Sequence, residues 1–331
     1  MKRGWSTVIE ILFSLAFVGL LLWVGMNVKP KAAKVSIQMP TIEKRDRFYG
    51  AAHAPDQPKI IWAIGKEGKI LKSENGAQSW QKQSIDSRIN LQDVAAWDSQ
   101  KAVIVGNDGA VFYTEDGGKN WHKTETPRSE VDNKLFRVKI SPSGQAIAVG
   151  VMGAVFASGD FGKSWHRIAP EEDVAWNDVT FKGNAIWVVG EFGQIKYTDD
   201  GGQAWKTIAS STDRSLMSIA FRDELNGLAV GLEGTMIETK DGGLTWTALP
   251  KVTAEHLFDA KWQNDHWFIV GDRGVMITGR QNDFKAAQLS DREYGWHTKI
   301  ESIQDMLIIA GSSLGIYKDH QWHSFEAGET K

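Results

Sequence analysis

The sequence predicts an all-β protein, a seven-bladed β-propeller preceded by one N-terminal transmembrane helix. A short β-branched run that ends in glycine recurs seven times, at steps of 40 to 44 residues. A period near 40 with several short strands in each repeat is typical of a propeller blade. A second motif, T/S-x-D-G-G-x-x-W or a close variant, follows five of these glycines. The seven glycines are Gly65, Gly106, Gly150, Gly190, Gly231, Gly271 and Gly311.

The transmembrane helix is predicted from residues 11–28, a run of 18 residues without a charge that can span a bilayer. Trp5 and Trp23 lie near the expected membrane interfaces. No small-x-small cleavage site follows the run, so we expect an uncleaved anchor in place of a removed signal peptide. Basic residues flank both ends, but the N-terminal tail is very short, so we expect it to stay in the cytoplasm. This predicts a single-pass protein of the inner membrane with its propeller in the periplasm.

The chain therefore divides into four segments. They are a cytoplasmic tail and anchor (1–28), a basic linker (29–47), the propeller (48–326) and a short C-terminal tail (327–331). Residues 216–246 show one repeat best: an alternating inner strand, a short apolar strand buried on both faces, a third strand, and an outer strand that Trp246 opens. Each repeat carries four strands of its own, so we expect a monomeric ring without strand exchange between its ends.

The T/S-x-D-G-G-x-x-W motif, the Asp-box, is expected to stabilise the turn between the third and fourth strands of a blade. Its hydroxyl and carboxylate can both accept backbone N–H groups, its glycines allow positive φ, and its tryptophan buries apolar surface between blades. Asn75 and Ala77 replace the usual Asp and Gly in the first blade, so that turn is expected to be weaker. One carboxylate in each turn is too few for a calcium site. The residues assigned this structural role are Ser73, Asn75, Trp80, Thr114, Asp116, Gly118, Trp121, Ser158, Asp160, Gly162, Trp165, Thr198, Asp200, Gly202, Trp205, Thr239, Asp241, Gly243 and Trp246.

The repeat resembles the Asp-box, or bacterial neuraminidase repeat, superfamily. The stretch AFRDELNGLAVGLEGTMIETKDGGLTW (220–246) is similar in particular to the photosystem II stability and assembly factor family of seven-bladed propellers, and the resemblance covers residues 48–325. It implies a non-enzymatic scaffold or chaperone that docks onto a membrane protein. Members that act on the photosystem tend to carry Arg directly before the second glycine of the G-x-x-G turn, and here only Arg273 matches. We therefore expect a different client; a transporter of the resistance-nodulation-division type is one hypothesis, resting on family association alone.

A partner-binding face is expected where the turns between second and third strands meet the loops that join the blades. Acidic and apolar residues alternate there, which suits docking to a protein surface. Two long loops, 123–134 and 285–297, are further candidates, because long loops on a rigid scaffold commonly carry recognition. The candidate partner-binding residues are Glu67, Asp108, Met152, Glu191, Phe192, Leu232, Glu233, Asp272, Arg273 and Leu314.

Composition excludes several kinds of site. The absence of cysteine removes disulfides, thiolate metal sites and cysteine nucleophiles. Residues 35–331 hold 33 basic and 40 acidic residues, and the net charge of −7 argues against sequence-independent binding of nucleic acid. His320 and His323 lie three apart on an expected strand and so point to opposite faces, which disfavours a shared metal. No phosphate-binding loop occurs, and we predict no metal, no cofactor and no catalytic residue.

Two classes of function remain open. The leading hypothesis is a membrane-anchored propeller that acts as an assembly, stability or accessory factor for a membrane-protein complex. The alternative is a sialidase-like or carbohydrate-binding propeller, because sialidases share the repeat. The resemblance to sialidases implies a cluster of three arginines around the substrate carboxylate. Arg137, Arg222 and Arg273 are the candidates for such a cluster, although no motif aligns them.

Overall fold

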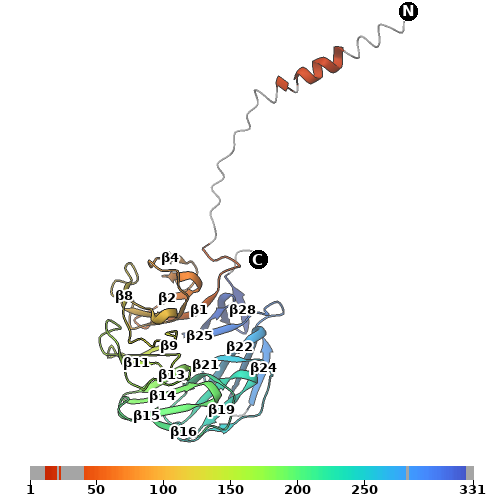
Figure 1. Cartoon of the computed structure of the whole chain (residues 1–331). Helices are drawn as coiled ribbons and strands as arrows, with labels where there is room; N and C mark the ends of the chain where they lie inside the picture. The colour runs from red at the N-terminus through yellow and green to blue at the C-terminus, as the bar shows by residue number, and fades with distance from the viewer. Residues whose placement is uncertain (1–11, 21, 24–40, 281–282, 326–331) are drawn as a thin grey trace, which may run out of the picture. The chain divides into compact units, whose positions relative to one another are not determined.

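Seven four-stranded antiparallel sheets follow one another around a ring, and the sheet of the last blade lies beside that of the first (Figure 1). The structure, a computed structural model, describes residues 12–20, 22–23, 41–280 and 283–325. Each sheet consists of four strands that are consecutive in the sequence. The predicted all-β propeller of seven blades is therefore confirmed, as is the absence of strand exchange.

The first four blades have the following strands. Blade one contains β1 (Phe48–Ala54), β2 (Gln57–Gly65), β3 (Ile70–Ser73) and β4 (Gln81–Gln83). Blade two contains β5 (Leu91–Ala96), β6 (Ala102–Gly106), β7 (Val111–Thr114) and β8 (His122–Thr124). Blade three contains β9 (Leu135–Ile140), β10 (Ala146–Gly150), β11 (Val155–Ser158) and β12 (His166–Arg167). Blade four contains β13 (Trp176–Lys182), β14 (Ala185–Gly190), β15 (Ile195–Thr198) and β16 (Lys206–Ile208).

The last three blades repeat the pattern. Blade five contains β17 (Leu216–Phe221), β18 (Gly227–Gly231), β19 (Met236–Thr239) and β20 (Thr247–Ala248). Blade six contains β21 (Leu257–Gln263), β22 (His266–Gly271), β23 (Val275–Arg280) and β24 (Asp283–Gln288). Blade seven contains β25 (His297–Ile303), β26 (Met306–Gly311), β27 (Leu314–Lys318) and β28 (Gln321–Ser324). Short 3-10 turns join the second and third strands of five blades: η1 (Lys66–Gly68), η2 (Asn107–Gly109), η3 (Glu191–Gly193), η4 (Leu232–Gly234) and η5 (Asp272–Gly274).

The glycine that ends each second strand is required by a close contact between backbones. A Cβ added to Gly231 would lie 2.1 Å from the carbonyl oxygen of Ser215, the residue before the first strand of the same blade. The same carbonyl accepts a hydrogen bond from Leu232 N at 3.0 Å. The equivalent contact recurs in all seven blades, so this position excludes side chains. The 40-residue period read from the sequence is the repeat of this contact.

The hydrophobic core is divided into clusters that lie between neighbouring blades. The second strands are almost wholly buried, as in β6 and β18, where all five residues are buried. Blades seven and one share one cluster, in which Phe48 and Ile61 pack with Ile308. Ring closure therefore rests on side-chain packing of the same kind as every other blade contact.

The propeller unit begins earlier than the sequence indicates. The compact unit starts at Thr41, and Ile42 is 5% exposed within the cluster shared by blades seven and one. Arg47 Nη1 donates to Ser312 O at 3.1 Å, and Asp46 pairs with Lys69. Residues 41–47, which the sequence assigns to a linker, thus pack on the first and last blades.

The two long loops are shorter than the sequence predicts. Residues 285–288 belong to β24, so the last of these loops spans 289–296. The other spans 125–134, because β8 extends to Thr124. Residues 12–20 and 22–23 are helical, and no helix within the described residues has the length and apolar character to cross a membrane. The rest of the predicted anchor, like the tail 327–331, lies outside the described residues.

Candidate partner-binding face and central channel

The turns between second and third strands present six side chains from an unusual backbone conformation. In these turns the residue before the second glycine has a φ between 49° and 57°. This left-handed conformation is uncommon for residues other than glycine and persists where the surroundings or a function require it. The six residues are Glu67, Asp108, Met152, Phe192, Glu233 and Arg273. We call the surface formed by these turns and by the loops between blades the turn face.

The second glycine of each turn holds these side chains in place. Gly234 has a φ of +70°, and a Cβ added to it would lie 2.0 Å from Thr253 O in the loop to the next blade. Gly193 makes the equivalent contact with Thr212 O at 2.1 Å. The turn is therefore fixed between its own blade and the following loop. Its outermost residue is presented by a backbone with little freedom to move.

The structure places nine of the ten candidate partner-binding residues on the turn face. Glu191 Oε2 accepts a hydrogen bond from Ala175 N at 2.9 Å, and Glu233 Oε2 lies 2.9 Å from Arg214 Nε. Phe192 is 71% exposed, which is unusual for a large apolar residue. The exposed members are Glu67, Asp108, Phe192, Glu233 and Arg273, and the half-buried members are Met152, Glu191, Leu232 and Asp272.

Leu314 is the exception, and its predicted exposure is wrong. It is fully buried, with 0% exposure, in the cluster between blades seven and one. Blade seven has one more residue between Gly311 and Gly315 than the other blades have in this turn. The extra residue places Leu314 in β27, opposite Ala310 of β26. Leu314 therefore belongs to the core.

The mouth of the central channel opens on the turn face. The first strand of each blade is the innermost one, and near its start one residue is skipped in the pairing with the second strand. In β5 the skipped residue lies between Leu91 and Asp93. Leu91 pairs with Gly106, the last residue before the turn of its blade, so the skipped residue lies at the turn face. Such irregularities re-aim a side chain, and here the seven skipped residues line one cavity. They are Tyr49, Gln92, Phe136, Asn177, Met217, Phe258 and Thr298.

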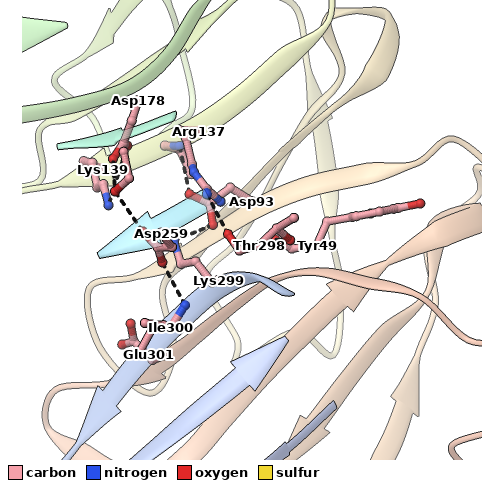
Figure 2. A network of polar contacts seen from close by, with 12 residues as sticks. Tyr49, Asp93, Arg137, Lys139, Asp178, Asp259, Thr298, Lys299, Ile300 and Glu301 are labelled. Atoms are coloured by element: carbon pink, nitrogen blue, oxygen red, sulfur yellow. Dashed lines mark hydrogen bonds and ion pairs between the residues drawn. The ribbon is translucent and has the colours of Figure 1, made fainter. Parts of the chain in front are cut away.

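Below the mouth, charged side chains of the innermost strands form a network. Most of these residues directly follow a skipped residue in the sequence. Figure 2 shows Arg137, Lys139, Lys299 and three aspartates close together in the channel. Each aspartate accepts a backbone N–H from the innermost strand of the following blade: Val138 N to Asp93 at 3.2 Å, Ile219 N to Asp178 at 3.0 Å, and Ile300 N to Asp259 at 2.8 Å. The network therefore ties neighbouring blades together at the axis.

The charges of this network compensate one another. Arg137 is 7% exposed, and Nη2 donates to Thr298 O at 2.7 Å. Burial opposes its charge, but Asp259, Asp93 and Asp178 attract it more strongly and raise the pKa of Arg137. Burial likewise opposes ionisation of Asp259, and Arg137 and Lys299 lower its pKa. Both groups are therefore held in their charged forms.

This network cannot be recognised from the spacing of residues in the sequence. The sequence does contain one indication of the network. Asp93, Asp178 and Asp259 each lie two residues after the start of an innermost strand that is otherwise largely apolar. A buried charge in a strand is expected to have a partner, but the partner is on another blade. Only the closed ring brings Lys299 to Asp93, which is 206 positions away in the sequence.

The Asp-box residues lie at the opposite end of the blades, on what we call the Asp-box face. In blade two, Gly118 N donates to Thr114 Oγ1 at 2.9 Å and Asn120 N donates to Asp116 Oδ1 at 2.9 Å. Burial opposes ionisation, but hydrogen bonds from the backbone and side chain of Asn120, from Thr114 Oγ1 and from Lys119 N together lower the pKa of Asp116 to about 2. In blade one, Asn75 Oδ1 accepts from Ser79 N at 3.0 Å, so the turn keeps this contact without the charge.

The three candidate arginines lie in different parts of the propeller. Of the three candidate arginines, Arg137 lies in the channel, Arg273 lies on the turn face, and Arg222 is the first residue after β17, toward the Asp-box face. Arg222 packs over the ring of Trp262 at 5.4 Å. The structure therefore does not bring them together. No group of three or more potential metal ligands occurs among the described residues.

Comparison with known proteins gives the family. The family model described as Photosynthesis system II assembly factor YCF48 matches residues 50–158, 129–213 and 203–320. The chain belongs to this family. The Photosystem II assembly lipoprotein Ycf48 of Nostoc sp. (strain PCC 7120) is 25% identical over 114 residues, which cover 32% of this chain. The match spans about a third (34%) of the length of that relative.

Solved structures of family members share the fold. YCF48 from Cyanidioschyzon merolae matches 82% of this chain and 95% of its own, with 16% identity and a TM-score of 0.68. YCF48 bound to D1 peptide matches 81% of this chain and 91% of its own, with 17% identity and a TM-score of 0.67. An ancestral GH74 enzyme matches 84% of this chain and 46% of its own, with 14% identity and a TM-score of 0.66. The fold is thus shared with an enzyme as well as with assembly factors.

Proposed function

We propose that this chain is a non-enzymatic assembly or stability factor that docks a membrane-protein client on its turn face. The observation that carries the proposal is the set of six left-handed, non-glycine residues arranged around the channel mouth. Backbone strain that recurs at one position of six blades is better explained by presentation of side chains than by packing, because the side chains are exposed or half-buried.

The relatives support this class of function. The curated relative is named as an assembly lipoprotein of photosystem II, and one structure holds a relative with a D1 peptide. The turn residues of this chain are mainly acidic or apolar, with Arg273 as the basic member of the six. We therefore propose a client whose docking surface differs in charge from that of photosystem II. A transporter of the resistance-nodulation-division type remains one candidate client.

Membrane attachment is part of the proposal. Residues 11–28 are long enough and uncharged enough to act as a single-pass anchor, with the propeller in the periplasm. An anchor and a docking face that contact the same client reinforce each other, because the first contact raises the effective concentration of the second. Replacement of the anchor by an unrelated transmembrane helix is therefore expected to weaken recovery of the client.

An enzymatic role has less support. The sialidase-like site that the resemblance implies has three arginines around a substrate carboxylate, whereas the channel holds one arginine and two lysines whose charges three aspartates already balance. The test is affinity purification of the full chain from its own membranes in mild detergent, with a screen for glycan binding and hydrolysis in parallel. We expect a membrane protein to co-purify and the glycan screen to be negative. Glycan binding without any membrane protein would contradict the proposal.

A further inference from the structure

The channel mouth is a formed cavity whose floor carries a buried cation with free donors. The cavity has a volume of about 210 Å³ and is lined by the seven skipped residues and by Arg137. Both hydrogen bonds from Arg137 to described residues start from Nη2. Its Nε and Nη1 therefore keep N–H donors without a partner among the described residues. Neither nitrogen is among the fully enclosed side-chain atoms that lack a partner, so both face the open cavity, where a carbonyl oxygen of a ligand can accept from them.

The charges around Arg137 indicate which acceptor fits. Asp93, Asp178 and Asp259 attract the guanidinium, and with Lys139 and Lys299 they complete a network of three cations and three anions. A carboxylate from a ligand would add a fourth anion without a cation to balance it. A neutral carbonyl needs no further compensation and accepts a strong hydrogen bond from a charged donor. The floor of the mouth therefore suits the main chain of a polypeptide better than an acidic sugar or a chain terminus.

The wall of the mouth suits a large apolar side chain. Four of the seven skipped residues are aromatic or methionine: Tyr49, Phe136, Met217 and Phe258. Tyr49 is held by stacking on Trp296, with ring centroids 5.6 Å apart and planes at 5°. Aromatic and methionine side chains are enriched in the centres of protein interfaces, where they contact apolar groups of a partner.

The loop between blades three and four is acidic at the rim of the mouth, although Lys196 pairs with Glu172 and Lys134 lies over the ring of Phe136. The loop 168–175, which joins these blades, contains Glu171, Glu172 and Asp173 and no basic residue. Glu171 and Asp173 are exposed and form no ion pair within 4 Å with any described residue. Phe192 projects from the turn of blade four and is 71% exposed. Charge complementarity therefore favours basic residues on a partner opposite Glu171 and Asp173.

We propose that the channel mouth receives a loop of the client protein that carries one large apolar side chain flanked by Lys or Arg. The apolar side chain enters the mouth, Arg137 donates to a main-chain carbonyl of the loop, and the basic residues lie over loop 168–175. This inference rests on the proposed function, because it names the chemistry of the client at the same face.

Filling the mouth is the first test. Met217→Trp adds an indole to the wall of the cavity, and recovery of the client with the full chain in mild detergent is expected to fall about tenfold or more. Leu244→Trp is the matched control, because it adds the same side chain at a position that is 58% exposed on the Asp-box face. It should leave recovery unchanged. If Met217→Trp does not fold, Phe258→Ala, which removes part of the wall, is expected to lower recovery instead.

Photo-cross-linking is the second test. A benzoylphenylalanine is placed at Phe258 in the mouth, at Phe192 on the rim and at Leu244 on the opposite face, each in the full chain in native membranes. The expected result is a cross-link from Phe258 to a client segment in which Lys or Arg flanks a large apolar residue. A cross-link from Phe258 to an acidic or uncharged segment overturns the inference.

The two tests separate failure of this inference from failure of the proposed function. Cross-links from Phe192 alone, together with full recovery by Met217→Trp, would overturn docking in the mouth and leave docking on the turn face intact. Cross-links to the client from Leu244 alone would overturn both.

Discussion

Lys299 Nζ of blade seven lies 2.7 Å from Asp93 Oδ1 of blade two, so this ion pair reaches across blade one at the channel axis (Figure 2). Blade one contributes Gly50 at the crossing point, and a Cβ there would lie 2.9 Å from Asp93 Cα and 3.1 Å from its Oδ1. Among the strands that the structure describes, none is exchanged between the first and last blades. The pair therefore acts as a clasp at the junction where the ends of the chain meet.

Lys299→Met should destabilise the propeller much more than an equivalent change on the surface. Loss of the lysine leaves Asp93, which is fully buried, without this cation, and breaking a buried pair costs about 3–5 kcal/mol. Lys318→Met is the control, because Lys318 pairs with Asp305 at the same 2.7 Å but is exposed, and solvent screening leaves such a pair with little effect on stability. Urea unfolding of both variants measures the difference. Equal urea midpoints for the two variants would contradict a stabilising role of the Lys299–Asp93 pair.

Asp241→Ala is expected to destabilise blade five by about 1–3 kcal/mol, because it removes the acceptor of two backbone donors. Asp241 Oδ1 accepts from Leu244 N at 3.1 Å and from Thr245 N at 2.9 Å. The measurement is the urea midpoint of the variant, with client recovery from its folded fraction as the control. Unchanged stability with lost client recovery would indicate that this Asp-box has a binding role instead.

Stability should fall on acidification because of His297. Burial lowers the pKa of His297 to about 4, against the attraction of Glu293. The unfolded chain, with a His pKa near 6.5, then binds more protons than the folded chain between pH 6.5 and 4. Stability is therefore full above this window and is lost as pH falls through it, by an amount on the order of 3 kcal/mol.

The variant His297→Leu tests this origin. Leucine occupies the equivalent strand start in β5, β9, β17 and β21, so the change fits the core. It should flatten the dependence of the urea midpoint on pH between 6.5 and 4, whereas His166→Leu at an exposed position should not. A variant that keeps the slope of the wild-type protein would assign the acid sensitivity to other groups.

Truncation should separate the anchor from the fold. Deletion of residues 1–34 is expected to leave a folded, monomeric propeller, because the strand edges of a propeller are short and protected. Deletion of residues 1–47 also removes Ile42 and Arg47 from blades seven and one, and is expected to cost about 2–4 kcal/mol. Thermal melting and size-exclusion chromatography of the two fragments compare them. Aggregation of the longer fragment would show that residues 1–34 complete the fold.

The sequence predicts the ring because its signals are local. Each marker glycine is fixed by a contact within its own blade, as Gly231 is by Ser215 O, so the period survives where the Asp-box is lost in blades six and seven. Leu314 could not be placed in the same way. One extra residue after Gly311 converts an exposed turn position into a buried strand position, and spacing alone does not reveal which result follows.

The channel is harder to predict because its contacts are not local. Tyr49, Phe136 and Phe258 are separated by about two blades or more in the sequence, and nothing in a single repeat indicates that they share a cavity. The skipped position that directs them inward is an irregularity of strand pairing, which hydrophobic alternation does not reveal. Most of the partner-binding candidates stand out in the sequence because they occupy a repeated turn with a fixed glycine on each side, and their binding role stays a prediction.

The most direct test of docking on the turn face is charge reversal on one face at a time. The first double variant reverses two charges on the turn face, Glu191→Lys and Glu233→Lys. The second double variant makes the same change in net charge on the Asp-box face, with Glu74→Lys and Glu224→Lys. The measurement is the amount of client recovered with the full, anchored chain in mild detergent, after melting curves confirm that both variants are folded. Docking on the turn face predicts that the first variant recovers about fivefold less client or worse, and that the second recovers as much as the wild-type protein. Equal recovery by the two variants, or a loss confined to the second, would contradict it.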